Sequence, residues 1–232
     1  TGDASDYDKF EKWAQTVPLC LRKTLYHWTH LELKEPFGIS DMLLGPDTAK
    51  EIYETCSQML KTPEFSVRSI MRRMNVKLVS TTEGPLDSLE HHKKIRDDGF
   101  EIKVHTAFRP DQAMAVENPA IWNAFVDKLQ EICGTDIADY QSFIEALRSR
   151  HDYFHQNGCR LSDHGLETAY AEDYTEQEIK SIFDKIRAGK TPNCSESLKF
   201  KSAIMHESAM MDHEAGWVQQ LHLGALRNNS TR

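Results

Sequence analysis

Four side chains able to bind anions or transfer protons stand at or near the ends of predicted strands. Arg109 follows one predicted strand, Asp163 and His164 close a second, and His222 lies near the end of a third. In parallel α/β sheets, polar groups at the carboxyl ends of the strands converge on one crevice. The pattern therefore predicts a site in which these groups meet.

Arg109 and His222 each allow a functional and a structural interpretation. Arg109 precedes Pro110, and proline disfavours the α region for the preceding residue, so Arg109 is expected to be extended at the exit of its strand. Its guanidinium could bind a carboxylate in bidentate fashion or form a structural salt bridge with Asp111, and the spacing favours neither. His222 shares a strand face with Gln220, which suits the polar inner mouth of a barrel, but a hydrogen-bonded core histidine is an equal alternative.

A short metal-like pattern, HDYFH, covers residues 151–155. His151 and His155 lie on one face of a predicted helix and could chelate zinc, with Asp152 as the acidic neighbour. Asp152 is one methylene shorter than the glutamate of the zinc-protease pattern. His155 lies in the last turn before Gly158, where an imidazole suits the negative end of the helix dipole. The structural interpretation is favoured, and zinc is kept as the alternative.

Composition excludes several classes of protein. The 232 residues carry a net charge of −8 and no run of Lys or Arg longer than a pair, which argues against a general nucleic-acid binder. No apolar run approaches the ~18–20 residues of a membrane span. The five cysteines are odd in number, far apart and without a C-x-x-C pair, as expected for reduced thiols of a cytosolic protein. P-loop, G-x-G-x-x-G and G-x-S-x-G motifs are absent.

Residues 1–74 are predicted to be helical, whereas residues 75–232 alternate strands and helices. The predicted strands are 76–82, 102–108, 159–164 and 217–223. The predicted helices are 6–15, 47–60, 66–74, 87–98, 119–133, 139–157, 175–188 and 195–214. Strands separated by crossovers of this length predict a parallel α/β sheet.

Four stretches of the sequence together resemble the uronate isomerases (glucuronate isomerases). They occur in the order found in that family and span nearly the whole chain. The stretches are LYHWTHLEL at 25–33 with FGI at 37–39, FRPD at 108–111, FHQNGCRLSDHG at 154–165, and QLHLGALRNN at 220–229.

The resemblance implies part of a (β/α)8 TIM-like barrel of the amidohydrolase superfamily. Residues 1–74 would be a helical insertion, and residues 75–232 would hold about four parallel strands, the second to the fifth of the barrel. The implied reaction converts D-glucuronate to D-fructuronate and D-galacturonate to D-tagaturonate. By the same resemblance, Arg109 would bind substrate, His222 would be the active-site histidine, and Asp163 and His164 match a family stretch without an assigned role.

The sequence also departs from the family pattern. The H-x-H that binds a divalent metal is absent, as are the following His-Tyr pair and the Asp-x-Arg and Trp of the last strands. Family chains are about twice as long, and this chain begins at Thr1 and ends soon after a predicted strand, so we expect a piece of a longer enzyme. The isolated piece is expected to show no turnover.

The remaining expectations concern the cofactor, partners and location of the intact enzyme. It would use a divalent metal, with zinc the first candidate, which this piece would not fully bind although His222 could contribute. The ligand would be a hexuronate sugar, and neither nucleic acid nor a membrane would be a partner. The enzyme could form a homo-oligomer, and its location would be the cytoplasm. The alternatives are another metal-dependent hydrolase of the amidohydrolase type and a non-catalytic module that binds a sugar acid or another subunit.

Overall fold

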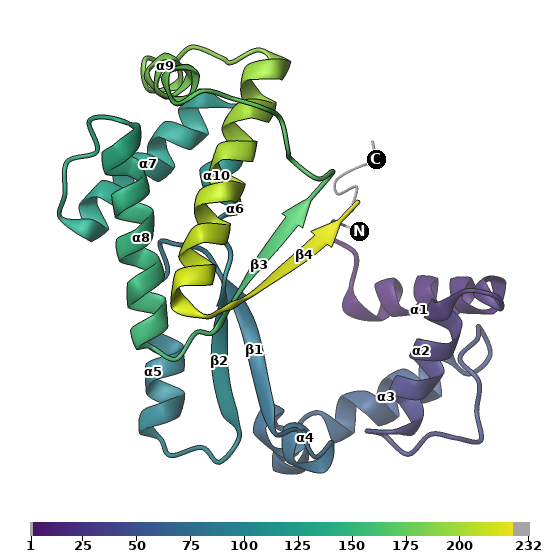
Figure 1. The fold of residues 1–232 in the computed structure, drawn as a ribbon. Coiled ribbons are helices and arrows are strands. Elements are labelled where there is room, and N and C mark those ends of the chain that lie inside the picture. The colour runs from purple at the N-terminus through teal and green to yellow at the C-terminus, as the bar shows by residue number, and fades with distance from the viewer. Residues whose placement is uncertain (1, 225–232) are drawn as a thin grey trace. The chain divides into compact units, whose positions relative to one another are not determined.

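The part of the chain from Leu78 onward is built on a sheet of parallel strands. They are β1 (Leu78–Glu83), β2 (Lys103–Phe108), β3 (Leu161–Leu166) and β4 (Val218–Leu223). In this computed structural model, which describes residues 2–224, the strands form one sheet in the order β1-β2-β3-β4. Figure 1 shows β1 beside β2 and β3 beside β4. Each strand pairs in parallel with the next. The predicted parallel α/β arrangement is therefore confirmed.

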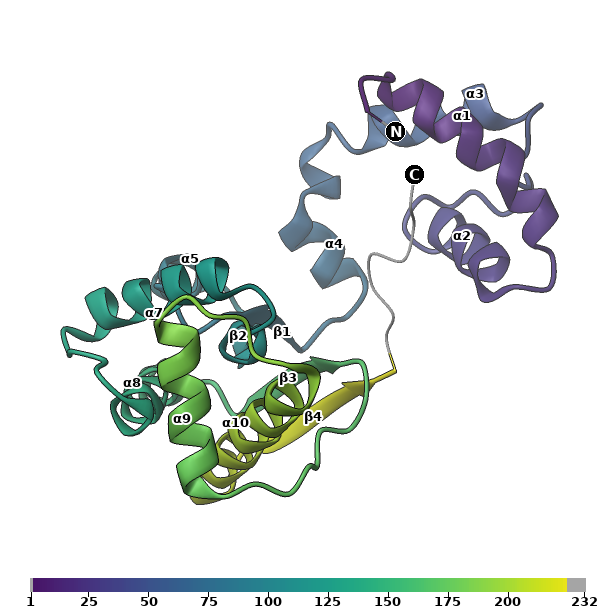
Figure 2. The same ribbon diagram turned by 90° about the horizontal axis from the view of Figure 1, so that it is seen from above.

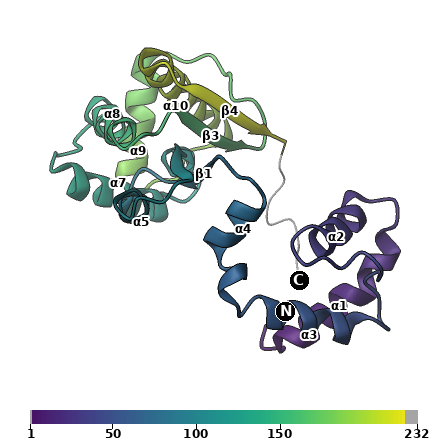
Figure 3. The ribbon, with the colours of Figure 1, turned by 90° about the horizontal axis from the view of Figure 1, so that it is seen from below.

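The helices that connect these strands gather on one side of the sheet (Figure 2). They are α5 (Glu90–Asp97), α6 (Asp111–Met114), α7 (Pro119–Cys133), α8 (Tyr140–Gln156), α9 (Glu176–Arg187) and α10 (Cys194–Ala215). Helix α8 contacts β2, and α10 lies beside β4 (Figure 3), whereas α7 and α9 pack on α8 and on each other. No helix among residues 2–224 is both long and apolar enough to cross a membrane.

A core of aromatic side chains fixes the helices of this layer. Trp122, Phe143, Phe183 and Phe200 are almost fully buried, and the Trp122 ring meets the other three edge-on with centroids 5.4–5.9 Å apart. Edge-to-face aromatic pairs add to the free energy gained from the buried apolar area. This core lies on the helical side of the sheet, whereas Thr82, Asp163 and His222 meet on the opposite face.

The first third of the chain, residues 2–77, is helical, as expected from its sequence. It contains α1 (Asp6–Thr16), α2 (Thr24–Lys34), α3 (Ala49–Met59), α4 (Val67–Arg73) and the 3-10 turns Val17–Cys20 and Pro63–Phe65. Its own core includes Ala14, Val17 and Ile52. The chain divides into two units between Lys77 and Leu78, three residues after the boundary drawn from the sequence.

The third strand differs from its sequence prediction. It runs from Leu161 to Leu166 rather than ending at His164, because its backbone pairs with β4 through Gly165 and Leu166. Asp163 and His164 therefore lie inside the strand. The stretch 220–229 quoted for the family resemblance continues past Gly224, and residues 225–229 lie outside the described part of the chain.

Candidate active site

Arg109 stands directly after β2 and is held there by its backbone. Its amide N–H donates to the carbonyl oxygen of Glu83 at 2.9 Å, which continues the pairing of β1 with β2 by one residue. Pro110 then turns the chain into α6. The guanidinium is thereby fixed at the carboxyl end of the sheet, with its side chain 23% exposed.

The Arg109 side chain reaches across to β3. Its Nη2 donates to Oδ2 of Asp163 in an ion pair, and its Nε lies 3.4 Å from the carbonyl oxygen of Asp163. Its Nε also lies 3.7 Å from Oδ2 of Asp111. The salt bridge with Asp111 weighed from the sequence is thus present, but Asp163 is the nearer partner.

Asp163 is the group on which the site converges. Its carboxylate is buried, and it accepts a hydrogen bond from Oγ1 of Thr82 at 3.3 Å as well as from Arg109. Its other oxygen, Oδ1, lies 2.6 Å from Nδ1 of His222. Groups from all four strands, or from the residue after a strand, therefore meet at one carboxylate, and Asp163 brings Arg109 and His222 together.

The contacts of His222 define which ring nitrogen carries the proton. A carboxylate can only accept, so Nδ1 donates to Asp163. The amide nitrogen of Gln220 lies 3.3 Å from Nε2 and can only donate, so Nε2 carries a lone pair. The side chain is about half exposed. When Nε2 is unprotonated, an imidazole oriented by a carboxylate in this way can accept a proton or a hydroxyl hydrogen bond at Nε2.

His164 faces the opposite side of β3 from Asp163, because successive residues of a strand point to opposite faces. The side chain is fully buried, and Nε2 lies 3.0 Å from Oγ of Ser162. Burial lowers the pKa of His164 below its usual value. The structure therefore brings Asp163 together with Arg109 and His222, and places the His164 ring in the layer between the sheet and the helices.

The two histidines of the metal-like pattern already have partners. His151 Nε2 lies 3.1 Å from Oδ1 of Asp212, and the ring stacks on Trp217 with centroids 3.8 Å apart. His155 Nδ1 accepts a hydrogen bond from Nε1 of Trp217 at 2.9 Å. Each imidazole thus has a hydrogen-bonded structural place around Trp217, which accounts for the pattern without zinc.

The side chains present do not by themselves fit a divalent metal. Within residues 2–224 there is no group of three or more His, Cys, Asp or Glu side chains placed to hold an ion. His222 and Asp163 are hydrogen-bonded to each other, and Asp163 is also paired with Arg109. No chemical step is therefore assigned to a metal bound by this chain alone.

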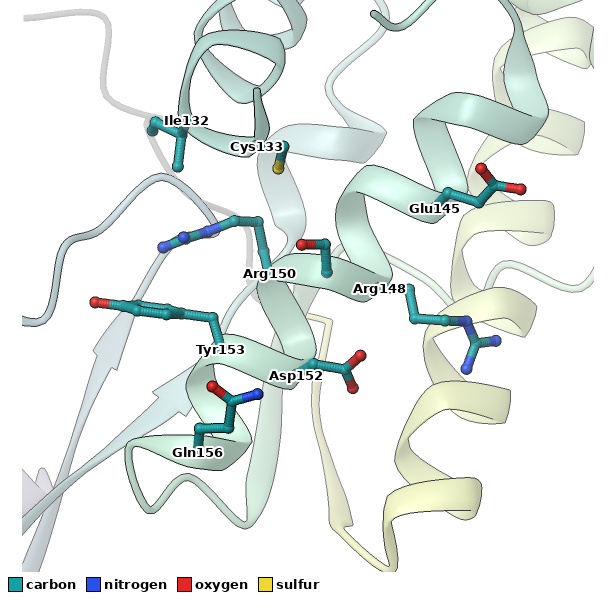
Figure 4. A pocket seen from close by; sticks show the side chains of 9 residues that line it. Ile132, Cys133, Glu145, Arg148, Arg150, Asp152, Tyr153 and Gln156 are labelled. Carbon is teal, nitrogen blue, oxygen red and sulfur yellow. The ribbon is translucent and has the colours of Figure 1, made fainter. Parts of the chain in front are cut away.

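A cavity of about 390 Å³ borders the candidate site through Asp111 and Gly165, and Lys201 and Tyr170 also line it. A larger hollow of about 570 Å³ lies on the surface of α7 and α8 and shares no lining residue with the site (Figure 4). There Arg150 lies over the Tyr153 ring, 4.1 Å from its centroid.

The polar groups of that larger hollow serve the structure of a neighbouring loop. The Arg150 guanidinium donates to the carbonyl oxygens of Pro85 and Asp87, both at 2.7 Å. Tyr153 donates to the carbonyl oxygen of Ser88 at 2.5 Å. These bonds fix the connection from β1 to α5, so we assign the hollow a structural role.

Sequence reasoning missed Thr82 and the central position of Asp163. Thr82 ends a polar run, Ser80-Thr81-Thr82, at the end of the first predicted strand, and that run was the available signal. Asp163 was noted only as a neighbour of His164, and separating the two requires knowing which strand face each side chain occupies.

The fold and the site define a class: a parallel α/β protein whose polar groups meet at the carboxyl end of its sheet. Two solved structures share this fold. A uronate isomerase from Thermotoga maritima matches with a TM-score of 0.89 and 32% identity, over 98% of this chain and 50% of that one. A glucuronate isomerase from Caulobacter crescentus gives a TM-score of 0.88 and 28% identity, over 98% of this chain and 47% of that one.

Sequence comparison places the chain in a family. A family model described as glucuronate isomerase matches residues 1–232, and the chain belongs to this family. The uronate isomerase of Bacteroides thetaiotaomicron is 54% identical over 230 residues, which is 99% of this chain and 49% of that protein. The uronate isomerase of Cellvibrio japonicus is also 54% identical, over 100% of this chain and 50% of that protein.

Two consequences follow from these matches. The four-stranded sheet is part of a TIM-like (β/α)8 barrel, as the family resemblance implied. The chain spans about half the length of the curated relatives it matches.

Proposed function

We propose that the protein to which this chain belongs is a uronate isomerase that interconverts D-glucuronate with D-fructuronate and D-galacturonate with D-tagaturonate. One observation carries the proposal: Arg109 and His222, 113 positions apart in the sequence, meet at Asp163 at the carboxyl end of the sheet. Isomerisation of a sugar acid requires a cation that binds its carboxylate and a proton acceptor near its reacting carbons, and Arg109 and His222 supply both at one end of the sheet.

Arg109 would anchor the carboxylate of the sugar acid. Its hydrogen bonds within residues 2–224 use Nε and Nη2, which leaves Nη1 to meet an additional acceptor. A guanidinium can pair with a carboxylate through two parallel N–H donors. We therefore assign substrate binding to Arg109 and expect the carboxylate of the substrate to compete with Asp111 for it.

His222 would act near the reacting carbons. An aldose–ketose interconversion moves a proton between C2 and C1 and needs groups that hold the oxygens on those carbons. With Nδ1 held by Asp163, the lone pair on Nε2 can accept a hydroxyl proton from the sugar. Asp163 would keep the ring in this tautomer and orientation.

The cofactor and location remain parts of the proposal. A divalent metal, with zinc the first candidate, would be held mainly by residues outside this chain, and His222 could contribute; residues 2–224 contain no group of three or more ligands placed to hold an ion. All five cysteines are unpaired, which supports a reducing compartment such as the cytoplasm. Whether the complete protein forms a homo-oligomer is left to measurement of its mass in solution.

The test uses the complete protein encoded by the reading frame that contains these residues. We expect ketose formation from D-glucuronate and D-galacturonate, followed by NMR, and no turnover by the 232-residue chain alone. Arg109→Met should lower kcat/KM about 30- to 1,000-fold, equivalent to about 2–4 kcal/mol, because a buried carboxylate loses its partner. Arg96→Met, at an exposed arginine on α5, is the matched control.

Three results would count against the proposal. Absence of isomerisation by the complete, metal-loaded protein would overturn the function. Unchanged kcat and KM in Arg109→Met would remove Arg109 from the site. Binding of a uronate without turnover would favour the non-catalytic module instead.

A further inference from the structure

Four buried polar side chains form a chain of contacts on the helical side of β3. His151 on α8 contacts Asp212 on α10, and Oδ2 of Asp212 lies 2.5 Å from Oγ of Ser162. Ser162 in turn lies 3.0 Å from Nε2 of His164. Every member is less than one-tenth exposed, and no Lys or Arg takes part. We call this set the β3 relay.

The β3 relay has a definite hydrogen-bond direction. As a carboxylate, Asp212 can only accept, so the single hydroxyl proton of Ser162 points to Asp212. Oγ of Ser162 must then accept from His164, which places a proton on Nε2 of His164. Because the ring is buried, the neutral form is favoured, and Nδ1 is left as a bare lone pair.

The bare nitrogen lies on the helical side of β3, near Asp111. Nδ1 of His164 is buried and has no hydrogen-bond partner within residues 2–224. It lies 4.0 Å from Oδ1 of Asp111. Asp111 is also the carboxylate whose Oδ2 lies 3.7 Å from Nε of Arg109 and accepts the N–H of Gly165 at 3.0 Å. Asp111 therefore links the buried relay to the guanidinium.

We propose that the β3 relay positions Arg109 by fixing the tautomer of His164. With its proton on Nε2, His164 presents only the lone pair of Nδ1 to Oδ1 of Asp111, and these two acceptors repel each other. The Asp111 carboxylate therefore remains beside the Arg109 guanidinium. A proton on Nδ1 would instead create a donor beside Oδ1 and draw Asp111 toward His164. In this proposal His164, Ser162 and Asp212 are positioning residues. The role of Arg109 as the residue that binds the substrate carboxylate rests on the proposed function.

The first test needs no variant. In the complete protein with 15N-labelled histidine, long-range 1H–15N correlation spectra distinguish a protonated ring nitrogen from a bare one. We expect His164 to show a bare Nδ1 and a protonated Nε2. A protonated Nδ1 would overturn the proposal, whatever the stability of any variant.

The second test cuts the β3 relay at Ser162. Ser162→Ala removes the acceptor for Nε2, so we expect the proton of His164 to move to Nδ1, and the Nε–H resonance of Arg109 to shift as Asp111 turns away. Ser162→Thr keeps the hydroxyl and should restore both signals. Ser195→Ala, at an exposed serine on α10, is the matched control and should change neither.

The outcomes separate this inference from the proposed function. A wild-type tautomer in Ser162→Ala, or a moved proton with no change at Arg109, would overturn the positioning role. Neither measurement uses a sugar, so a protein that fails to isomerise uronates would leave the β3 relay standing.

Discussion

Removing the charge of Asp163 should destabilise the second unit by about 2 kcal/mol. The Asp163 side chain is 6% exposed and that of Arg109 is 23% exposed, so the pair lies between the buried and exposed cases. Breaking a buried pair costs about 3–5 kcal/mol, whereas exposed pairs contribute about 0.2–1 kcal/mol. In Asp163→Asn the guanidinium keeps its contacts with Asp111 and with the backbone carbonyl of residue 163. We therefore expect a cost between the ranges for exposed and buried pairs.

Urea unfolding followed by circular dichroism measures this cost. With a slope of about 2 kcal/mol/M, a loss of about 2 kcal/mol lowers the midpoint by about 1 M. Asp152→Asn, at an exposed aspartate on α8, is the control and should shift the midpoint by less than about 0.25 M. A shift confined to Asp163→Asn assigns the cost to the buried, paired position rather than to the loss of a carboxylate charge in general.

A double-mutant cycle isolates the ion pair. If Asp163 and Arg109 interact as the geometry indicates, Asp163→Asn and Arg109→Met should show a coupling energy of about 1–2 kcal/mol. Additive effects, within about 0.3 kcal/mol, would refute the reasoning, because the two side chains would then contribute independently. Additive effects would also contradict the conclusion that the site converges on Asp163.

Three further outcomes follow from burial and hydrogen bonding. Burial lowers the pKa of His164, so the unfolded chain takes up a proton at this residue before the folded chain does as the pH falls. The free energy of unfolding should therefore decrease below about pH 6.5, by at most about 1.4 kcal/mol per pH unit. In urea titrations at several pH values, His164→Gln should show a smaller decrease. Burial raises the pKa of Cys159 to about 11, so iodoacetamide at pH 8 should modify the exposed Cys194 and spare Cys159 in mass spectra of the folded chain. Arg150→Met should lower the free energy of unfolding in urea by about 2–4 kcal/mol, because two loop carbonyls lose a buried charged donor. Arg148→Met, at a more exposed arginine of the same helix, should lower it by less than about 1 kcal/mol.

Each of these expectations has a result that contradicts it. Equal pH slopes in His164→Gln and the wild type would show that His164 does not titrate on unfolding. Modification of Cys159 as fast as Cys194 would show that the thiol is accessible. Equal midpoints for the two arginine variants would show that Arg150 does not hold the loop between β1 and α5.

Local signals were sufficient where a helix carries its own boundaries. The predicted helix 119–133 has the limits that the structure gives; Pro119 suits its first turn, and Gly134 suits its end. The side chain of Asn118 accepts the backbone N–H of Ile121 at 3.3 Å, and Gly134 has a φ of 65°, which favours glycine. Neither feature depends on the rest of the fold.

The end of β3 could not be read locally. Gly165 is a weak strand former, so the sequence pointed to an end at His164. In the structure Gly165 is paired opposite His222, a partner 57 positions later in the sequence, and its N–H donates to Asp111. Partners this distant in sequence override the local preference, and no window of a few residues contains them.

The same limit explains which site residues were found. Arg109 and His222 stood out because each has one recognisable group near the end of its strand. Asp163 and His164 are adjacent in sequence but differ in role, since one faces Arg109 and the other faces the helices. A shift of the strand by one residue would exchange them, placing an imidazole beside Arg109 and a carboxylate in the apolar layer. The register of β3, fixed by its pairing with β4 along its whole length, therefore decides that Arg109 meets a carboxylate.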